Sequence, residues 1–149
     1  MPPTLEQKRA LHAWKEVEDL ISKYTNKKDQ EEYEGEAKKL PSRIINAGLG
    51  QALAFIHAKR NKKKPLELLE KHISDWILIE RKLLPIISNN DTPPKILLEA
   101  IVKSNSSEYL RRVTDETMAY MIWINRFLEA QIEPDIKEKK DDRTHHSPS

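Results

Sequence analysis

The sequence contains no cysteine among its 149 residues. This absence excludes disulfide bonds, thiolate zinc sites and cysteine nucleophiles, and it is typical of a cytoplasmic protein. No apolar run reaches the roughly 18 residues that a membrane-spanning helix requires, and no amino-terminal signal pattern is present. We therefore expect neither membrane insertion nor secretion.

Glycine occurs only three times, which is too few for the turns and phosphate-binding loops of a typical α/β enzyme. Leu, Ile, Ala, Lys and Glu are abundant instead, and these residues favour helices. The sequence therefore predicts an all-α fold, with a single compact bundle of about five to six helices over residues 1–132 and a disordered polar tail over 133–149. The abundance of Lys, Glu and Arg also indicates a thermophile.

Apolar spacing and capping residues place the first helices. One helix is expected over about residues 5–24, with Thr4 as its N-cap. A second helical region begins near Asp29 and contains Pro41. Because an interior proline costs a helix roughly 3 kcal/mol, we expect this region to be kinked or broken at Pro41.

Three further helices follow from similar signals. Pro65 suits the first position of a helix, and Thr92 is placed to cap a short one. Asn105, followed three residues later by Glu108, resembles a capping box for the last helix, which Pro134 ends. That last helix has the clearest apolar stripe, so we expect it to be central to the bundle.

Acidic residues are missing from one long segment, residues 37–66, which we call the acid-free segment. Charged residues make up 34% of the chain and the net charge is only +2, so this gap is unlike the rest of the sequence. The segment holds eight basic residues: Lys38, Lys39, Arg43, Lys59, Arg60, Lys62, Lys63 and Lys64. Such a basic face predicts contact with nucleic-acid phosphates, although a lysine-rich stretch at 59–64 is equally typical of a solvated linker.

Aromatic residues are nearly absent from the same segment. Phe55 is the only one, and we expect it in the core. Without aromatic side chains among the basic ones, base stacking is not predicted, and RNA binding should be independent of sequence.

Gly48 and Gly50 are unusual within a helical pattern, since each costs about 1 kcal/mol relative to alanine. One interpretation is a helix break in which both act as turn residues. We favour a continuous helix whose small residues, Gly48 and Ala52, allow close packing against a neighbouring helix or subunit.

Candidate catalytic and metal-binding groups are few. His12, His57 and His72 lie far apart in sequence and match no H-E-x-x-H pattern, so we predict no metal and no cofactor. Glu116 interrupts the apolar stripe of the last helix one turn after Arg112, which favours a structural ion pair between the two. A small hydrolase using Glu116 as a general acid is an alternative, but no nucleophile or glycine-rich loop supports it, and we predict a protein that is not an enzyme.

Two motifs together suggest a family. Residues 40–55 carry Leu-Pro-x-x-Ile followed by Gly-Leu-x-x-Ala-Leu-Ala-Phe, and residues 111–127 carry Arg-Arg-x-Thr-x-Glu followed by Trp-Ile-x-Arg-Phe. In this order they resemble the second and last helices of the small subunit of the type III-B (Cmr-type) CRISPR effector complex. The resemblance covers about residues 5–131, and it adds Arg111 and Arg112 to the predicted nucleic-acid-binding residues.

The resemblance implies a non-catalytic subunit of an antiviral ribonucleoprotein. Its expected partners are CRISPR RNA and target RNA, the large and backbone subunits of the complex, and other copies of itself stacked beside the backbone. Target RNA cleavage would belong to the backbone subunits. A helical protein–protein adaptor without any nucleic-acid role is the alternative function.

Overall fold

The structure is a computed structural model that describes residues 2–84 and 92–132. Within these residues the chain is helical and contains no strand, which confirms the all-α prediction. The elements are α1 (Leu5–Lys23), α2 (Lys27–Ala47), α3 (Leu49–Lys59), α4 (Lys64–Ser74), the π-helix η1 (Asp75–Glu80), α5 (Pro93–Lys103) and α6 (Ser107–Gln131). The expected disordered tail and the helix end at Pro134 lie outside the described residues.

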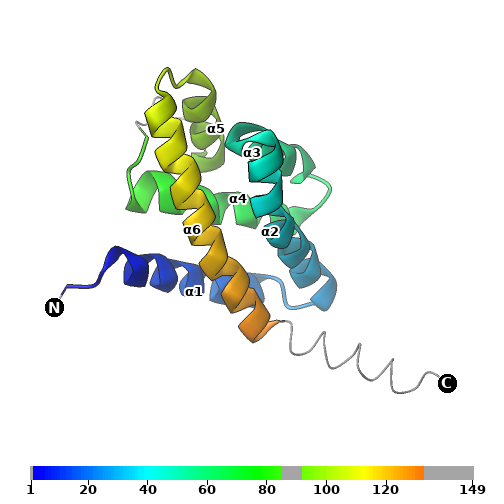
Figure 1. Cartoon of the computed structure of the whole chain (residues 1–149). Helices are drawn as coiled ribbons and strands as arrows, with labels where there is room; N and C mark the ends of the chain where they lie inside the picture. The colour runs from blue at the N-terminus through cyan, green and yellow to red at the C-terminus, as the bar shows by residue number, and fades with distance from the viewer. Residues whose placement is uncertain (1, 85–91, 133–149) are drawn as a thin grey trace, which may run out of the picture.

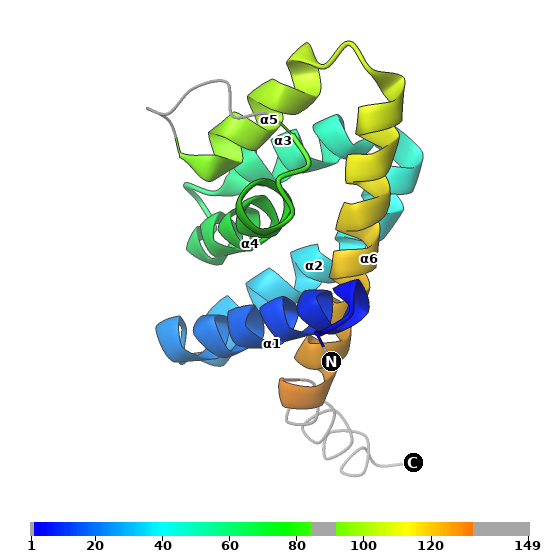
Figure 2. The same ribbon diagram turned by 90° about the vertical axis from the view of Figure 1, so that its left-hand side faces the viewer.

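The long helix α6 organises the bundle. It crosses α1 and also packs against α2, while α4 lies behind them and contacts α2, α3 and α5 (Figures 1 and 2). Tyr33 of α2 and Tyr120 of α6 are among the largest fully buried side chains, so the core sits where these helices meet. Among the described residues, no helix is both long and apolar enough to cross a membrane.

Helix α1 begins where its capping residues predict. The Thr4 hydroxyl accepts a hydrogen bond from the backbone N–H of Gln7, whose side chain in turn accepts one from the backbone N–H of Thr4. This reciprocal arrangement satisfies two amide donors that a helix start otherwise leaves unpaired. The last helix is capped one residue later than expected, by Ser106 in place of Asn105.

Helix α2 continues through Pro41 to Ala47, whereas the sequence led us to expect a kink or break at the proline. Proline lacks an N–H, so the carbonyl of Ala37, one turn earlier, has no partner within the helix. The side-chain amide of Asn125 on α6 donates a hydrogen bond to that carbonyl at 3.1 Å. A tertiary contact therefore replaces the hydrogen bond that Pro41 removes.

The break falls at Gly48 instead, which is both the C-cap of α2 and the N-cap of α3. Its backbone has φ +88° and ψ 159°, a region that essentially only glycine occupies. The favoured continuous helix through Gly48 was therefore wrong, and the turn interpretation of this glycine was right.

Candidate nucleic-acid interface

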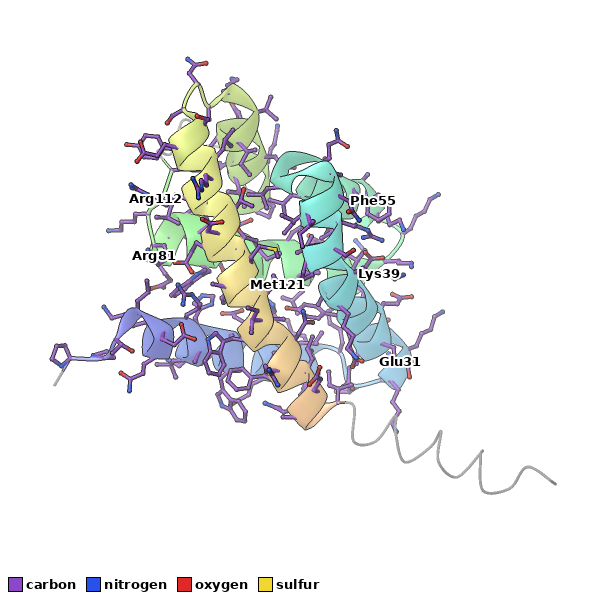
Figure 3. The ribbon with its side chains drawn as sticks, in the orientation of Figure 1. Glu31, Lys39, Phe55, Arg81, Arg112 and Met121 are labelled. Carbon is purple, nitrogen blue, oxygen red and sulfur yellow. The ribbon has the colours of Figure 1, made fainter. Side chains whose placement is uncertain are left out.

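The acid-free segment covers the second half of α2, all of α3 and the start of α4, so its basic residues share one side of the molecule only in part. Lys39 on α2 and Phe55 on α3 lie on the same side of the bundle (Figure 3). Arg112 on α6 lies on the opposite side of this view, as does Arg81. The fold therefore separates Arg112 from the basic residues of α2 and α3.

Two buried glutamates neutralise three of the predicted cations. Glu36, which is 3% exposed, forms ion pairs with Arg43 and, at 3.9 Å, with Lys59. Glu34 pairs with Lys38 one turn later at 3.2 Å. Both carboxylates precede the acid-free segment in the sequence, and in the folded chain they form ion pairs with cations of that segment.

Phe55 is not in the core as expected, because 39% of its side chain is exposed. The Arg43 guanidinium lies 4.0 Å and the Lys59 ammonium 4.1 Å from the centroid of its ring. Cations are attracted to an aromatic ring at this distance. Phe55 thus acts with Glu36 to hold Arg43 and Lys59 in place.

Of the remaining lysines, Lys62 and Lys63 belong to the 60–63 link between α3 and α4, and Lys39 belongs to α2. Lys39 and Lys63 both line a shallow surface hollow of about 260 Å³, together with acidic residues from the start of α2. Among the described residues, no ion pair involves Lys39, Lys62 or Lys63. These three lysines are consequently available for an external anion.

Arg60 and Lys64 at either end of this link are partly engaged. The Arg60 guanidinium donates a 2.6 Å hydrogen bond to the carbonyl of His57. Lys64 lies 4.0 Å from Glu67, with both side chains exposed. An exposed pair at this distance is weak, so Lys64 remains accessible to solvent anions.

Within the chain, Gly48 and Ala52 do not form the expected packing face, and contact of Gly48 with another subunit stays a prediction. A Cβ at Gly48 would meet no atom within 4 Å, whereas Ala52 is already buried inside the chain. A Cβ at Gly50 would lie 3.4 Å from the side chain of Ile101 on α5. Position 50 therefore faces α5 within the bundle, at a distance where an added Cβ would make ordinary van der Waals contact.

The expected ion pair between Arg112 and Glu116 is also wrong. Arg112 lies 3.6 Å from Glu108, and both side chains are largely exposed. Glu116 instead accepts hydrogen bonds from Arg9 of α1 at 2.6 and 3.1 Å and from Arg81 at 2.9 Å.

The π-helix η1 explains how Glu116 obtains a third donor. In a π-turn hydrogen bonds run from residue i to i+5, so residues five apart lie one above the other. Trp76 and Arg81 have this spacing, and the Trp76 indole N–H donates to Glu116 at 3.3 Å. Burial raises the pKa of Glu116, but the hydrogen bonds from Arg9, Arg81 and Trp76 outweigh it and hold the pKa below its ordinary value.

This environment argues against Glu116 as a general acid. Its carboxylate is 6% exposed and both of its oxygens accept hydrogen bonds from arginine. A general acid requires a raised pKa and access to substrate, and Glu116 has neither. The hydrolase interpretation therefore loses the residue on which it depended.

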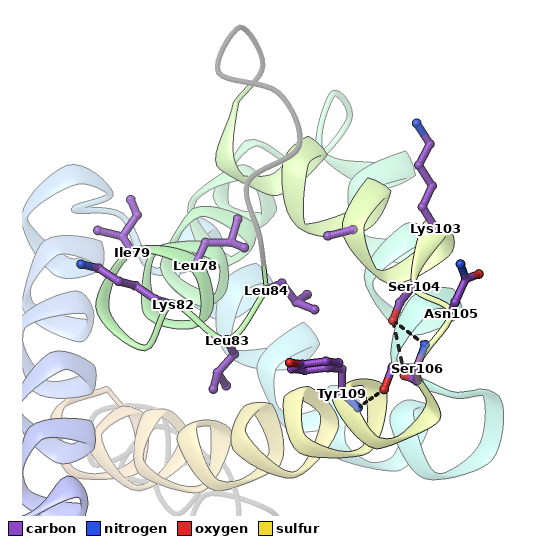
Figure 4. Close-up of a pocket in the computed structure, with 11 residues that line it drawn as sticks. Leu78, Ile79, Lys82, Leu83, Leu84, Lys103, Ser104, Asn105, Ser106 and Tyr109 are labelled. Carbon is purple, nitrogen blue, oxygen red and sulfur yellow. Dashed lines mark hydrogen bonds between the residues drawn. The ribbon is translucent and has the colours of Figure 1, made fainter.

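A surface hollow of about 1030 Å³ lies between η1, α5 and the start of α6 (Figure 4). Its walls are mostly apolar, with Leu78, Leu83 and Tyr109 facing it. Within the described part of the chain, Lys82 and Lys103 are the only ionisable groups that line it apart from the tyrosine hydroxyl. Its described lining therefore offers no carboxylate or imidazole for acid–base chemistry.

The geometry defines a helical protein with a well-packed core and a basic surface formed by two helices and the link that follows them. The family model for CRISPR-associated protein (Cas_Cmr5) matches residues 5–131, and the chain belongs to this Cmr5 family. It is the small subunit of a type III-B CRISPR effector complex, which confirms the resemblance seen in the two sequence motifs.

A solved structure supports this membership. The chain is similar to the X-ray crystal structure of a CRISPR-associated Cmr5 family protein from Thermus thermophilus, with 28% sequence identity and a TM-score of 0.66. The match covers 87% of this chain and 99% of that one. The bundle described above is therefore the fold of the family.

Proposed function

We propose that this chain is a non-catalytic structural subunit that contacts the backbone of guide or target RNA in the cytoplasm, without sequence preference. Membership of the Cmr5 family makes it a component of the effector complex, and we propose that several copies stack beside the backbone subunits. The relative from Thermus agrees with the compositional indication of a thermophile.

The observation that carries the RNA contact is the set of lysines without ion pairs where the 60–63 link passes α2. Lys39, Lys62 and Lys63 have no carboxylate within ion-pair distance among the described residues, unlike Arg43 and Lys59. Ammonium groups that are not already paired can bind phosphates without first breaking an internal contact. Their flexible stems also suit backbone contact better than base recognition.

The test compares two double substitutions with equal loss of charge. Lys62→Gln/Lys63→Gln removes two lysines of the proposed contact, and Lys8→Gln/Lys15→Gln removes two exposed lysines of α1. Affinity for an unstructured single-stranded RNA is measured by fluorescence anisotropy over a range of salt concentrations. If both lysines contact phosphates, the first variant should lower the log–log salt slope by about 1.4, since each contact contributes about 0.7.

The α1 variant should change the slope much less. Equal losses in both variants would show that the RNA senses only net charge. If neither variant loses RNA affinity, the protein–protein adaptor without a nucleic-acid role is favoured. The paired cations of α2 and α3 would then have only a structural role.

A further inference from the structure

Helices α1 and α4 bring three potential metal ligands to one point. Glu16 and Asp19 are three residues apart on α1, so their side chains project from the same face. The Nε2 atom of His72 on α4 lies 2.7 Å from Glu16 Oε2 and 3.2 Å from Asp19 Oδ2. All three ligand atoms lie within 4.8 Å of one another.

His72 distinguishes this group from an ordinary patch of surface carboxylates. Its side chain is fully buried, and its Nδ1 atom is 2.7 Å from the hydroxyl of Tyr33, which is also fully buried. A polar partner on one ring nitrogen fixes the orientation of a histidine whose other nitrogen binds a metal. Here that other nitrogen, Nε2, points at two carboxylates, which accept hydrogen bonds but cannot donate them when ionised.

Two arrangements satisfy these contacts. In the first, Nε2 carries a proton and donates it to Glu16 or Asp19. In the second, a cation lies between the three atoms and takes the place of that proton. Donors that share one ion at bond lengths of about 2.0–2.2 Å are separated by about 3–4 Å. The contact from His72 to Asp19 already has this length, and the contact to Glu16 needs to open by about half an ångström.

We propose that Glu16, Asp19 and His72 bind one divalent transition-metal ion, with Zn²⁺ as the preferred occupant. One imidazole nitrogen and two carboxylate oxygens suit borderline ions such as Zn²⁺ or Co²⁺, whereas Ca²⁺ and Mg²⁺ prefer oxygen alone. Water would complete the coordination, because Glu16 and Asp19 are only partly buried. The ion would join α1 to α4. This proposal differs from the prediction of no metal, which was based on the distance between the histidines in the sequence.

Neighbouring charges leave room for such an ion. Lys23 lies 3.6 Å from Asp19, but its side chain is half exposed and can turn toward solvent. The Nε2 atom of His12 lies 3.8 Å from Glu16, beyond hydrogen-bond distance, and the Nδ1 atom of the same ring is 2.7 Å from the hydroxyl of Tyr120. Neither neighbour is therefore fixed between the three ligand atoms.

The experiment measures Zn²⁺ and Co²⁺ binding to the whole chain by titration calorimetry and Co²⁺ absorption. Because His145 and His146 near the C-terminus could bind metal on their own, the background variant is His145→Ala/His146→Ala. We expect one ion per chain in this background and a rise in melting temperature with Zn²⁺. Glu16→Gln and Asp19→Asn should each weaken binding at least tenfold and abolish the rise.

Glu18→Gln is the matched control, since Glu18 is an exposed carboxylate on the same helix, and it should bind like the background. Far-UV circular dichroism without metal checks that each variant folds. Binding that disappears with the two terminal histidines, or that survives both Glu16→Gln and Asp19→Asn, would overturn the proposal. Failure of the background variant to bind either ion would overturn it as well.

Discussion

Replacing Glu116 by glutamine tests the hydrogen-bond arrangement in which α1, η1 and α6 meet. The substitution preserves the size of the side chain but removes the carboxylate that Arg9 and Arg81 share, while Arg9 keeps its ion pair with the exposed Glu6. Removing one partner of a buried ion pair typically costs 3–5 kcal/mol. The Arg9 and Arg81 side chains are 12% and 31% exposed, so water compensates part of the loss. We expect Glu116→Gln to lower the free energy of unfolding by about 2–3 kcal/mol at pH 7.

The control for this substitution is Arg112→Gln. Arg112 and Glu108 have side chains that are 58% and 83% exposed, and such a pair contributes under about 1 kcal/mol. Urea denaturation of both variants and the wild type gives the three free energies. If Arg112→Gln costs as much as Glu116→Gln, or if Glu116→Gln costs nothing, the assignment of Arg9 and Arg81 as the partners is refuted.

The pH dependence of the same difference provides a second check. The folded protein holds the pKa of Glu116 below its ordinary value, because hydrogen bonds from three donors outweigh burial. The stability that this carboxylate contributes is therefore fully present above the pKa of an unfolded glutamate, and it is lost as the pH falls through the folded pKa. The wild-type advantage over Glu116→Gln should shrink as the pH is lowered below about 4.

The same preparations also separate the structural from the hydrolytic interpretation. We expect neither the wild type nor Glu116→Gln to cleave RNA, with or without Mg²⁺ or Mn²⁺. Metal-dependent cleavage by the wild type that vanishes in a fully stable Glu116→Gln variant would favour the enzyme.

Two further predictions concern the glycines and Phe55. Gly48→Ala should lower the free energy of unfolding by about 1–3 kcal/mol in urea denaturation, because φ at Gly48 is +88°. Gly35→Ala should be neutral or stabilise by up to about 1 kcal/mol, because Gly35 lies inside α2 and an added Cβ would meet no atom within 4 Å. Equal effects of the two substitutions would contradict the break at Gly48. Phe55→Leu should leave RNA affinity within about twofold, since cations already lie against the ring, whereas base stacking on Phe55 would contribute about 1–3 kcal/mol and its loss would be plain in the anisotropy titration.

Features set by neighbouring residues were predictable from the sequence. The start of α1 follows from Thr4 and Gln7, which cap it through contacts three residues apart. The apolar stripe of α6 and the scarcity of glycine were enough for the all-α fold. The two family motifs also required only local sequence, and the family match confirmed them.

Features that depend on distant residues were not predictable. Asn125 supports the helix at Pro41 from 88 residues away, measured to the carbonyl of Ala37. Arg9 contacts Glu116 although the two are 107 residues apart in the sequence. Sequence spacing alone favoured Arg112 as the partner, because it lies one helical turn before Glu116. The π-helix also has no clear local signal, although it sets the spacing between Trp76 and Arg81.

The salt dependence of RNA binding should reflect the pairing of the basic residues more than their number. Drawing Arg43 or Lys59 toward a phosphate would leave the buried Glu36 carboxylate with fewer partners, which opposes such a movement. If all ten predicted cations bound phosphates, the log–log slope would approach about 7 in magnitude, whereas Lys39, Lys62 and Lys63 alone give about 2. A slope near 2 in magnitude for the isolated wild-type chain would show that only about three cations contact phosphates. The internal carboxylates that pair with the other cations would then limit RNA binding, which a count of basic residues alone does not predict.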